Sequence, residues 1–95
     1  MEIVVETYLS IGENSRSNIR ARPLLGQGIS PETKVECSKS IRENYPIGQL
    51  FVIPVHWKST SEMESCLYVS YRSLDLMKPV TREQAKEFLL REYRN

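Results

Sequence analysis

Hydrophobic and polar positions alternate most clearly between residues 45 and 80, where the chain carries most of its bulky apolar side chains. Two runs of β-type residues, 49–58 and 66–72, flank a polar segment that contains Ser, Thr and Glu. This pattern is typical of a β-hairpin, with its apolar side chains on one face at every second position. These apolar residues are Phe51, Ile53, Val55 and Trp57 on the first strand and Leu67, Val69 and Tyr71 on the second. We therefore expect the core to be built on this hairpin.

Shorter strands are predicted on the N-terminal side of the hairpin. Their ranges are residues 2–11, 18–24 and 33–37. In the second of these strands, Ile19 and Ala21 would point toward the interior because successive side chains of a strand alternate between its two faces. Pro23 removes a backbone donor, so this strand is expected at an edge of the sheet or to end there.

A C-terminal helix is predicted over residues 82–94. Thr81 is a good N-cap, and Gln84 stands at the reciprocal position of a capping box. The apolar face of this helix consists of Ala85, Phe88, Leu89 and Tyr93. This narrow stripe provides one contact surface, so we expect Phe88 and Leu89 to be buried against the sheet, with Tyr93 at the margin.

Antiparallel strands followed by one helix predict an α+β fold, with a sheet of four or five strands in a single domain of residues 1–95. Pro54 interrupts the first hairpin strand and predicts either an edge position or a bulge that bends the strand. Gly48, the bent strand at Pro54 and the run 78–80 before the helix resemble small SH3-like barrels at the level of fold. The resemblance implies a sheet that curls into a barrel, and an open sheet covered by the helix is the alternative. Neither arrangement implies a function.

Composition and charge restrict the partners only slightly. Apolar residues make up 40% and charged residues 26% of the 95 residues, which is ordinary globular usage. The net charge of +1 gives no global attraction to nucleic acid or anionic lipid. The longest apolar run, residues 50–55, is too short to cross a membrane, and the first residues lack the features of a signal peptide. We therefore expect a cytoplasmic location without a membrane partner.

Residues able to carry catalytic or metal chemistry are few. Cys37 and Cys66 are expected to be small buried residues in a reducing environment, and the sequence leaves open whether they are close together. His56 is the only histidine, and together with the cysteines it has none of the short ligand spacings of a structural zinc site. No metal or cofactor is expected. An enzyme that uses His56 is the third and least favoured hypothesis, because it would need a nearby thiol and an orienting carboxylate.

Three arginines provide the clearest indication of a binding surface. Arg16, Arg20 and Arg22 share the same parity, and no acidic residue lies between them. On an extended strand Arg20 and Arg22 would project together, and guanidinium groups can bind phosphate or carboxylate through two hydrogen bonds. The alternative is a solvated face whose charges protect an edge strand from aggregation.

The leading hypothesis is a small non-enzymatic binding module for a protein partner, including a second copy of the chain. Exposed Trp, Tyr and Arg side chains are common anchors of protein interfaces. Nucleic-acid binding through the arginine strand is the alternative hypothesis, and exposed aromatic residues would add a stacking surface. The candidate binding residues are Arg16, Arg20, Arg22, Trp57, Tyr71 and Arg72.

Overall fold

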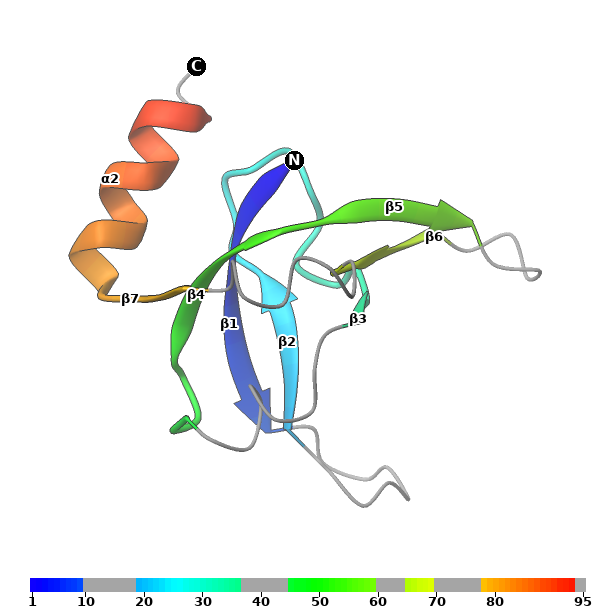
Figure 1. Cartoon of the computed structure of the whole chain (residues 1–95), viewed down its shortest axis with the longest axis horizontal. Coiled ribbons are helices and arrows are strands. Elements are labelled where there is room, and N and C mark those ends of the chain that lie inside the picture. Colours follow the sequence, from blue (N-terminus) through cyan, green and yellow to red (C-terminus); the bar gives the residue numbers. More distant parts are fainter. Residues whose placement is uncertain (10–18, 37–44, 60–64, 70–77, 94–95) are drawn as a thin grey trace.

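The computed structural model describes residues 1–9, 19–36, 45–59, 65–69 and 78–93. These residues form seven strands and one helix (Figure 1). The elements are β1 (Glu2–Leu9), β2 (Ile19–Pro23), β3 (Val35–Glu36), β4 (Leu50–Pro54), β5 (His56–Ser59), β6 (Ser65–Tyr68), β7 (Lys78–Val80) and α2 (Arg82–Glu92). The predicted α+β class is confirmed.

The described strands hydrogen-bond in two sheets rather than in the single sheet of four or five strands expected from the sequence. One sheet has four antiparallel strands in the order β2-β1-β4-β7. The other has the order β3-β6-β5, and its β3 runs parallel to β6. In Figure 1 the strands of the two sheets cross steeply, as in orthogonal sheet packing. The SH3-like barrel stays a prediction.

Pro54 lies at the corner where the chain passes from one sheet to the other. β4 pairs with β1 and β7, whereas β5 pairs with β6, and only Val55 separates β4 from β5. The amide of Val55 donates to the carbonyl of Met1 at 2.7 Å, next to the proline that cannot donate. The expected hairpin is therefore confirmed for β5 and β6 and wrong for β4, because the chain changes partners at this corner.

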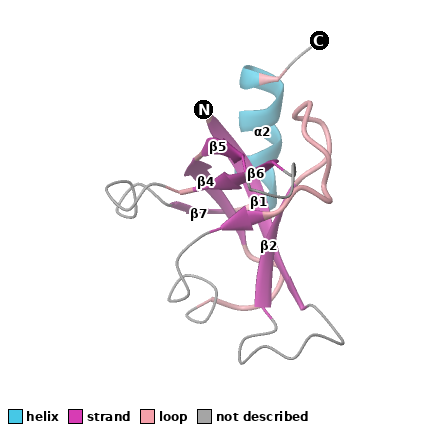
Figure 2. Cartoon of the chain, turned by 90° about the vertical axis from the view of Figure 1, so that its right-hand side faces the viewer, coloured by secondary structure: helices cyan, strands magenta, loops and turns pink. Residues whose placement is uncertain are grey.

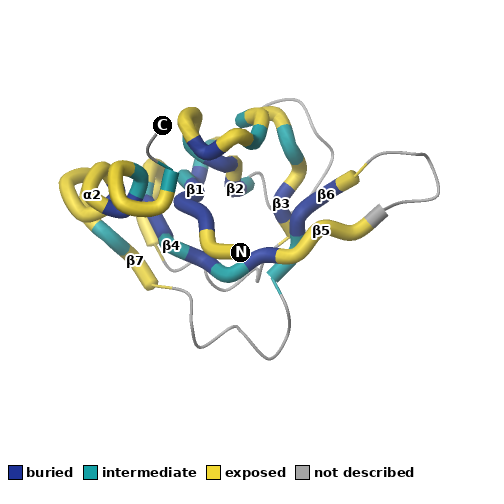
Figure 3. Tube along the Cα trace, turned by 90° about the horizontal axis from the view of Figure 1, so that it is seen from above, coloured by how far each residue is buried: buried dark blue, intermediate teal, exposed yellow. Residues whose placement is uncertain are grey.

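A shared core fills the space between the two sheets. Its buried residues are Ile3, Val5, Ala21, Val35, Phe51, Ile53, Val55 and Leu67. This set includes three of the four apolar positions predicted for the first hairpin strand: Phe51, Ile53 and Val55. Trp57, the fourth apolar position of the predicted strand, is 53% exposed, so it lies at the edge of the core. Figure 3 shows buried segments in β1, β4 and β6 and an exposed β5.

Helix α2 covers the opposite face of the four-stranded sheet. Figure 2 shows the helix upright alongside this sheet, and its buried residues Ala85 and Phe88 pack with Val4 and Leu50. The predicted capping box is confirmed: Thr81 Oγ1 accepts from the amide of Gln84 at 3.1 Å, and Gln84 Oε1 accepts from the amide of Thr81 at 2.9 Å.

The C-terminal end of α2 differs slightly from the prediction. The helix ends at Glu92, and Leu89 is half-buried rather than buried, whereas Tyr93 lies at the margin as expected. The hydroxyl of Tyr93 donates to the carbonyl of Glu2. Partial burial raises the pKa of Tyr93. The helix is thus hydrogen-bonded to the start of β1.

The central strand β1 needs a side chain to complete its hydrogen bonds. β2 ends at Pro23, and beyond it the amide of Leu24 donates to the carbonyl of Val4 at 3.0 Å. The buried side chain of Gln27 accepts from the amide of Val4 at 2.7 Å and donates to its carbonyl at 2.9 Å. Gln27 therefore pairs with Val4 as a neighbouring strand residue would.

Thr7 has a related role at the other end of β1. It is 2% exposed, and its hydroxyl accepts from the amides of Gly48 and Gln49, both at 3.1 Å. Gly48 has a φ of 91°, in the left-handed region that favours glycine. The buried hydroxyl thus holds the turn that leads into β4.

We expect Gln27→Ala to lower the free energy of unfolding by about 1–3 kcal/mol, because the buried amide of Val4 loses its partner. Urea unfolding followed by circular dichroism measures this change. The control is Leu25→Ala in the same loop, where the side chain is 77% exposed and the expected change is below about 0.5 kcal/mol. Equal effects of the two substitutions would contradict the role assigned to Gln27.

Phe88→Ala should lower the free energy of unfolding by about 3–5 kcal/mol, because it opens a cavity between α2 and the sheet. Leu90→Ala on the same helix is the control, since Leu90 is 59% exposed and should change stability by less than about 0.5 kcal/mol.

Truncation before Thr81 should abolish cooperative thermal unfolding, because whole domains have only about 5–15 kcal/mol of stability. A truncated chain with an unchanged cooperative transition would show that α2 is not part of the fold.

Candidate functional site

Three of the six predicted binding residues are among the described residues, and these three do not lie on the same sheet. Arg20 and Arg22 lie on β2 of the four-stranded sheet, whereas Trp57 lies on β5 of the three-stranded sheet. β2 approaches β3, at the opposite edge of the second sheet from β5. Two separate candidate surfaces result. The remaining predicted residues, Arg16, Tyr71 and Arg72, lie outside the described residues.

The first surface, called the arginine surface, consists of Glu6, Tyr8, Arg20, Arg22 and Arg82. Strand register pairs Glu6 with Arg22 and Tyr8 with Arg20, so these four side chains share one face of the sheet. The guanidinium of Arg22 lies 3.2 Å from Glu6 Oε1 and 4.7 Å from the centre of the Tyr8 ring. Arg82 lies at the start of α2, and its Nη2 is 3.6 Å from Glu6 Oε2.

Glu6 limits what the arginine surface can bind. Its side chain is only 19% exposed, between the more exposed side chains of Arg22 and Arg82. Ion pairs at a protein surface contribute little stability, but a carboxylate in this position partly neutralises both guanidinium groups. A phosphate would have to compete with Glu6 for both arginines. Sequence reasoning missed Glu6 and Arg82 because only strand register and helix packing bring them to this surface.

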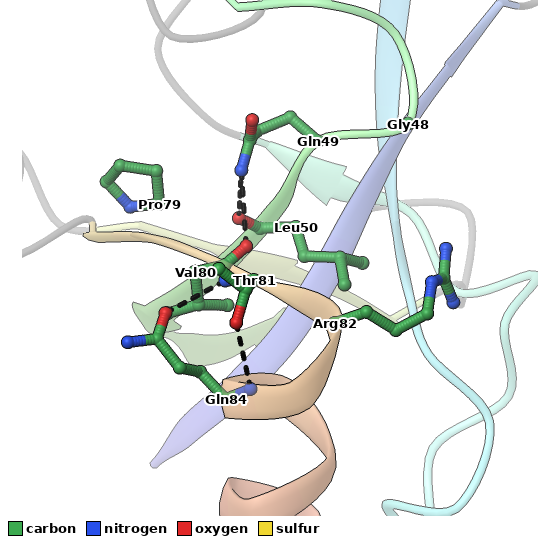
Figure 4. Close-up of a pocket in the computed structure, with 8 residues that line it drawn as sticks. All are labelled: Gly48, Gln49, Leu50, Pro79, Val80, Thr81, Arg82 and Gln84. Carbon is green, nitrogen blue, oxygen red and sulfur yellow. Dashed lines mark hydrogen bonds between the residues drawn. The ribbon is translucent and has the colours of Figure 1, made fainter.

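A pocket of about 420 Å³ lies beside the arginine surface, between β4, β7 and the start of α2. Gln49 Nε2 donates to the carbonyls of Leu50 at 3.0 Å and Val80 at 3.3 Å (Figure 4). Thr81 and Gln84 use their side chains for the capping box, and Figure 4 shows the Arg82 side chain directed away from Gln84. The polar groups that line this pocket therefore hold local structure and do not converge on a ligand.

The second surface is the outer edge of β5, called here the β5 edge. Trp57 pairs with Leu67 of β6, and the amide of Leu67 donates away from β5, to the carbonyl of Lys34 at 2.9 Å. In an antiparallel pair of strands, two residues directly opposite each other either exchange both N–H···O=C hydrogen bonds or both direct their N–H and C=O groups away from the partner strand. The backbone N–H and C=O of Trp57 therefore point to the β5 edge. No strand within the described parts of the chain pairs with this edge.

Side chains of both faces flank the β5 edge. The half-exposed Trp57 extends the face of the core, and the other face carries His56 and Lys58 beside Tyr68. The rings of His56 and Tyr68 lie 5.6 Å apart. Lys58 Nζ lies 2.7 Å from Glu36 Oε2, and this hydrogen bond lowers the pKa of Glu36 and raises the pKa of Lys58. Lys58 thus stays charged and is ion-paired with a residue of its own sheet.

His56 is not part of a catalytic arrangement of described residues. It is exposed and contacts the ring of Tyr68, and neither a thiol nor a carboxylate of the described chain hydrogen-bonds to it. Cys66 is buried and reduced, and Cys37 lies outside the described residues. Among the residues that the structure covers, no group of three or more His, Cys, Asp or Glu could hold a metal ion.

Comparison of the chain with models of known families, with curated proteins and with solved structures gave no match. Within the described residues, no helix has the length and apolar character needed to cross a membrane. Functional inference therefore depends on the arginine surface and the β5 edge.

We expect an NMR titration to give Glu36 a carboxyl pKa below its ordinary value of 4.5, because Lys58 donates to the charged form. The stabilisation is present at pH values above the ordinary pKa and is lost as the pH falls through the lowered pKa. Lys58→Met should return the pKa toward its ordinary value, and Lys86→Met on the exposed face of α2 should leave it unchanged. A Glu36 pKa that does not respond to Lys58→Met would contradict this pairing.

Proposed function

We propose that this chain is a non-enzymatic binding module that binds an extended segment of a protein partner at the β5 edge. The observation that carries the proposal is Trp57, a half-exposed indole on a strand whose outward backbone groups have no strand partner in the described chain. A partner strand would supply main-chain hydrogen bonds by β-augmentation. The indole would supply an aromatic anchor of the kind that dominates binding energy at protein interfaces.

The described outer edges other than the β5 edge are less suitable for strand addition. β7 has only three residues, and its central residue Pro79 has no backbone N–H to donate. β2 and β3 lie next to each other, and β3 has only two residues. Strand addition is therefore proposed for β5 alone.

A protein partner is favoured over nucleic acid by the position of Glu6, which contacts both Arg22 and Arg82 on the arginine surface. Nucleic-acid binding through this surface is the second candidate. An SH3-like barrel and a cytoplasmic location belong to the same proposal. The shared core of the two sheets and the approach of β2 to β3 support the barrel.

We expect peptides selected from a displayed random library to bind the chain in extended conformation and to protect the backbone amide of Trp57 from hydrogen exchange. Trp57→Ala should weaken such binding by at least about 30-fold, because anchor residues contribute about 2 kcal/mol or more. Leu90→Ala, which removes an exposed apolar side chain from α2, should leave the affinity unchanged.

Two results would contradict this proposal. The first is that selected peptides bind the Trp57→Ala variant with full affinity and leave the Trp57 amide of the wild-type chain unprotected, which would place the binding surface elsewhere. The second is that oligonucleotides bind in a salt-dependent manner that Arg22→Ala abolishes, which would support the arginine surface as a nucleic-acid site.

A further inference from the structure

We infer that the partner segment at the β5 edge runs antiparallel to β5, end to end with β1, and places an apolar side chain opposite Trp57 and an acidic side chain opposite Lys58. This inference rests on the proposed function, because it gives the bound segment a direction, a register and a side-chain pattern. It is carried by the position of Met1, by the exposed apolar side chains beside the edge, and by the charges of the outer sheet face.

The β5 edge continues the side of β4 that β1 covers. The amide of Val55 donates to the carbonyl of Met1 at 2.7 Å. Backbone groups point to alternate sides along an extended strand, so those of Trp57, two residues further on, point to the same side as those of Val55. Figure 1 shows the N-terminal end of β1 beside the junction of β4 and β5. A strand at the β5 edge would therefore lie end to end with β1.

Met1 limits how far a bound segment extends toward β4. The register that pairs Glu2 with Pro54 places Met1 opposite Val55, so the segment can pair with Trp57 but must leave the ladder before Val55. A segment antiparallel to β5 runs in the same direction as β1 and extends the antiparallel ladder of β1 and β4. Antiparallel pairing is also slightly more stable per residue than parallel pairing. The C-terminal end of the paired segment therefore lies next to Met1.

An apolar side chain fits the ladder position opposite Trp57. Met1 is 51% exposed and Trp57 is 53% exposed, and Met1 lies diagonally across the ladder from Trp57 on the face of the core. The partner residue opposite Trp57 would point to the same face, beside both side chains. Cross-strand contacts with an aromatic ring and contacts with a methionine sulfur are favourable. This position therefore gives the bound segment its apolar anchor.

The outer face of the three-stranded sheet favours an acidic side chain next to the anchor. Lys58 donates to Glu36 at 2.7 Å, and the pKa of Glu36 is lowered by this hydrogen bond and also by the charge of Lys34. Among the described residues of this face, two lysines thus share one carboxylate. The partner residue opposite Lys58 points to this face, so a carboxylate there would balance the second lysine. An exposed pair of this kind contributes modestly to affinity.

A five-residue extension, Thr-Val-Glu-Leu-Gly, tests the register when it is placed directly before Met1 of the full chain, behind an initiator methionine. Its leucine would lie opposite Trp57 and its glutamate opposite Lys58. Hydrogen exchange followed by NMR should show the Trp57 amide protected at least about tenfold more than in the unextended chain. The extension should also weaken binding of selected peptides by at least about tenfold, because a tethered strand has a high effective concentration at the edge.

The matched control is the extension Val-Thr-Leu-Glu-Gly, which has the same composition with neighbouring residues exchanged. It would place the glutamate opposite Trp57 and the leucine on the outer face, because side chains of a strand alternate. The Trp57 amide should then gain less than about a third of the protection given by the first extension. Circular dichroism of each variant establishes that the fold is retained.

The acidic position is tested by replacing the glutamate of the first extension with lysine, which should lower the protection of the Trp57 amide by about twofold to fivefold. The difference between the glutamate and lysine extensions should shrink when Lys58→Met is introduced. Lys86→Met on α2 is the control and should leave this difference unchanged. A difference that Lys58→Met does not alter would contradict the acidic residue opposite Lys58.

The inference and the proposed function fail in distinguishable ways. If the two extensions protect the Trp57 amide equally or not at all, the register end to end with β1 is wrong. The proposed function still stands in that case if selected peptides protect the amide in the unextended chain. If neither extensions nor selected peptides protect it, both fail. Protection that depends on the order of leucine and glutamate supports the inference.

Discussion

Burial of both faces of β1 is the constraint on which the rest of the structure depends. Ile3 and Val5 face the core between the sheets, and Val4 faces α2, with all three side chains at most 1% exposed. A strand buried on both faces cannot leave its backbone groups to water, so every N–H and C=O needs a partner from the protein. β2 and β4 supply most of these partners, and the amide side chain of Gln27 supplies them where β2 has ended.

Sequence patterns predicted the features whose causes are local. The capping box of Thr81 and Gln84 depends on residues three positions apart, and the apolar positions up to Val55 depend on strand alternation. Pro54 was expected at an edge or at a bulge; it is the last residue of β4, still opposite Glu2 of β1, and the chain passes to the other sheet directly after it. Strand pairing was predicted less well: the hairpin interpretation assumed that consecutive strands pair along their whole length, whereas β4 pairs with β1.

Features set by distant parts of the chain gave no readable signal. A glutamine between two glycines has the composition of a turn, and only the position of Val4 explains why Gln27 is buried. Arg82 joins Arg22 only because both approach Glu6 from different elements. Alternation assigned Trp57 to the core face correctly, but its exposure depends on the strand lying at the edge of a sheet, which alternation does not encode.

The hydrogen bond between Tyr93 and Glu2 joins residues 91 positions apart in the sequence. It has a consequence for synthesis, because a ribosome makes β1 before the other described elements and α2 after all seven described strands. Until α2 emerges, the face of β1 that carries Val4 has no helix to cover it, and contacts between distant segments are slow to form. A nascent chain halted before Thr81 therefore presents an apolar stripe to chaperones and to neighbouring nascent chains.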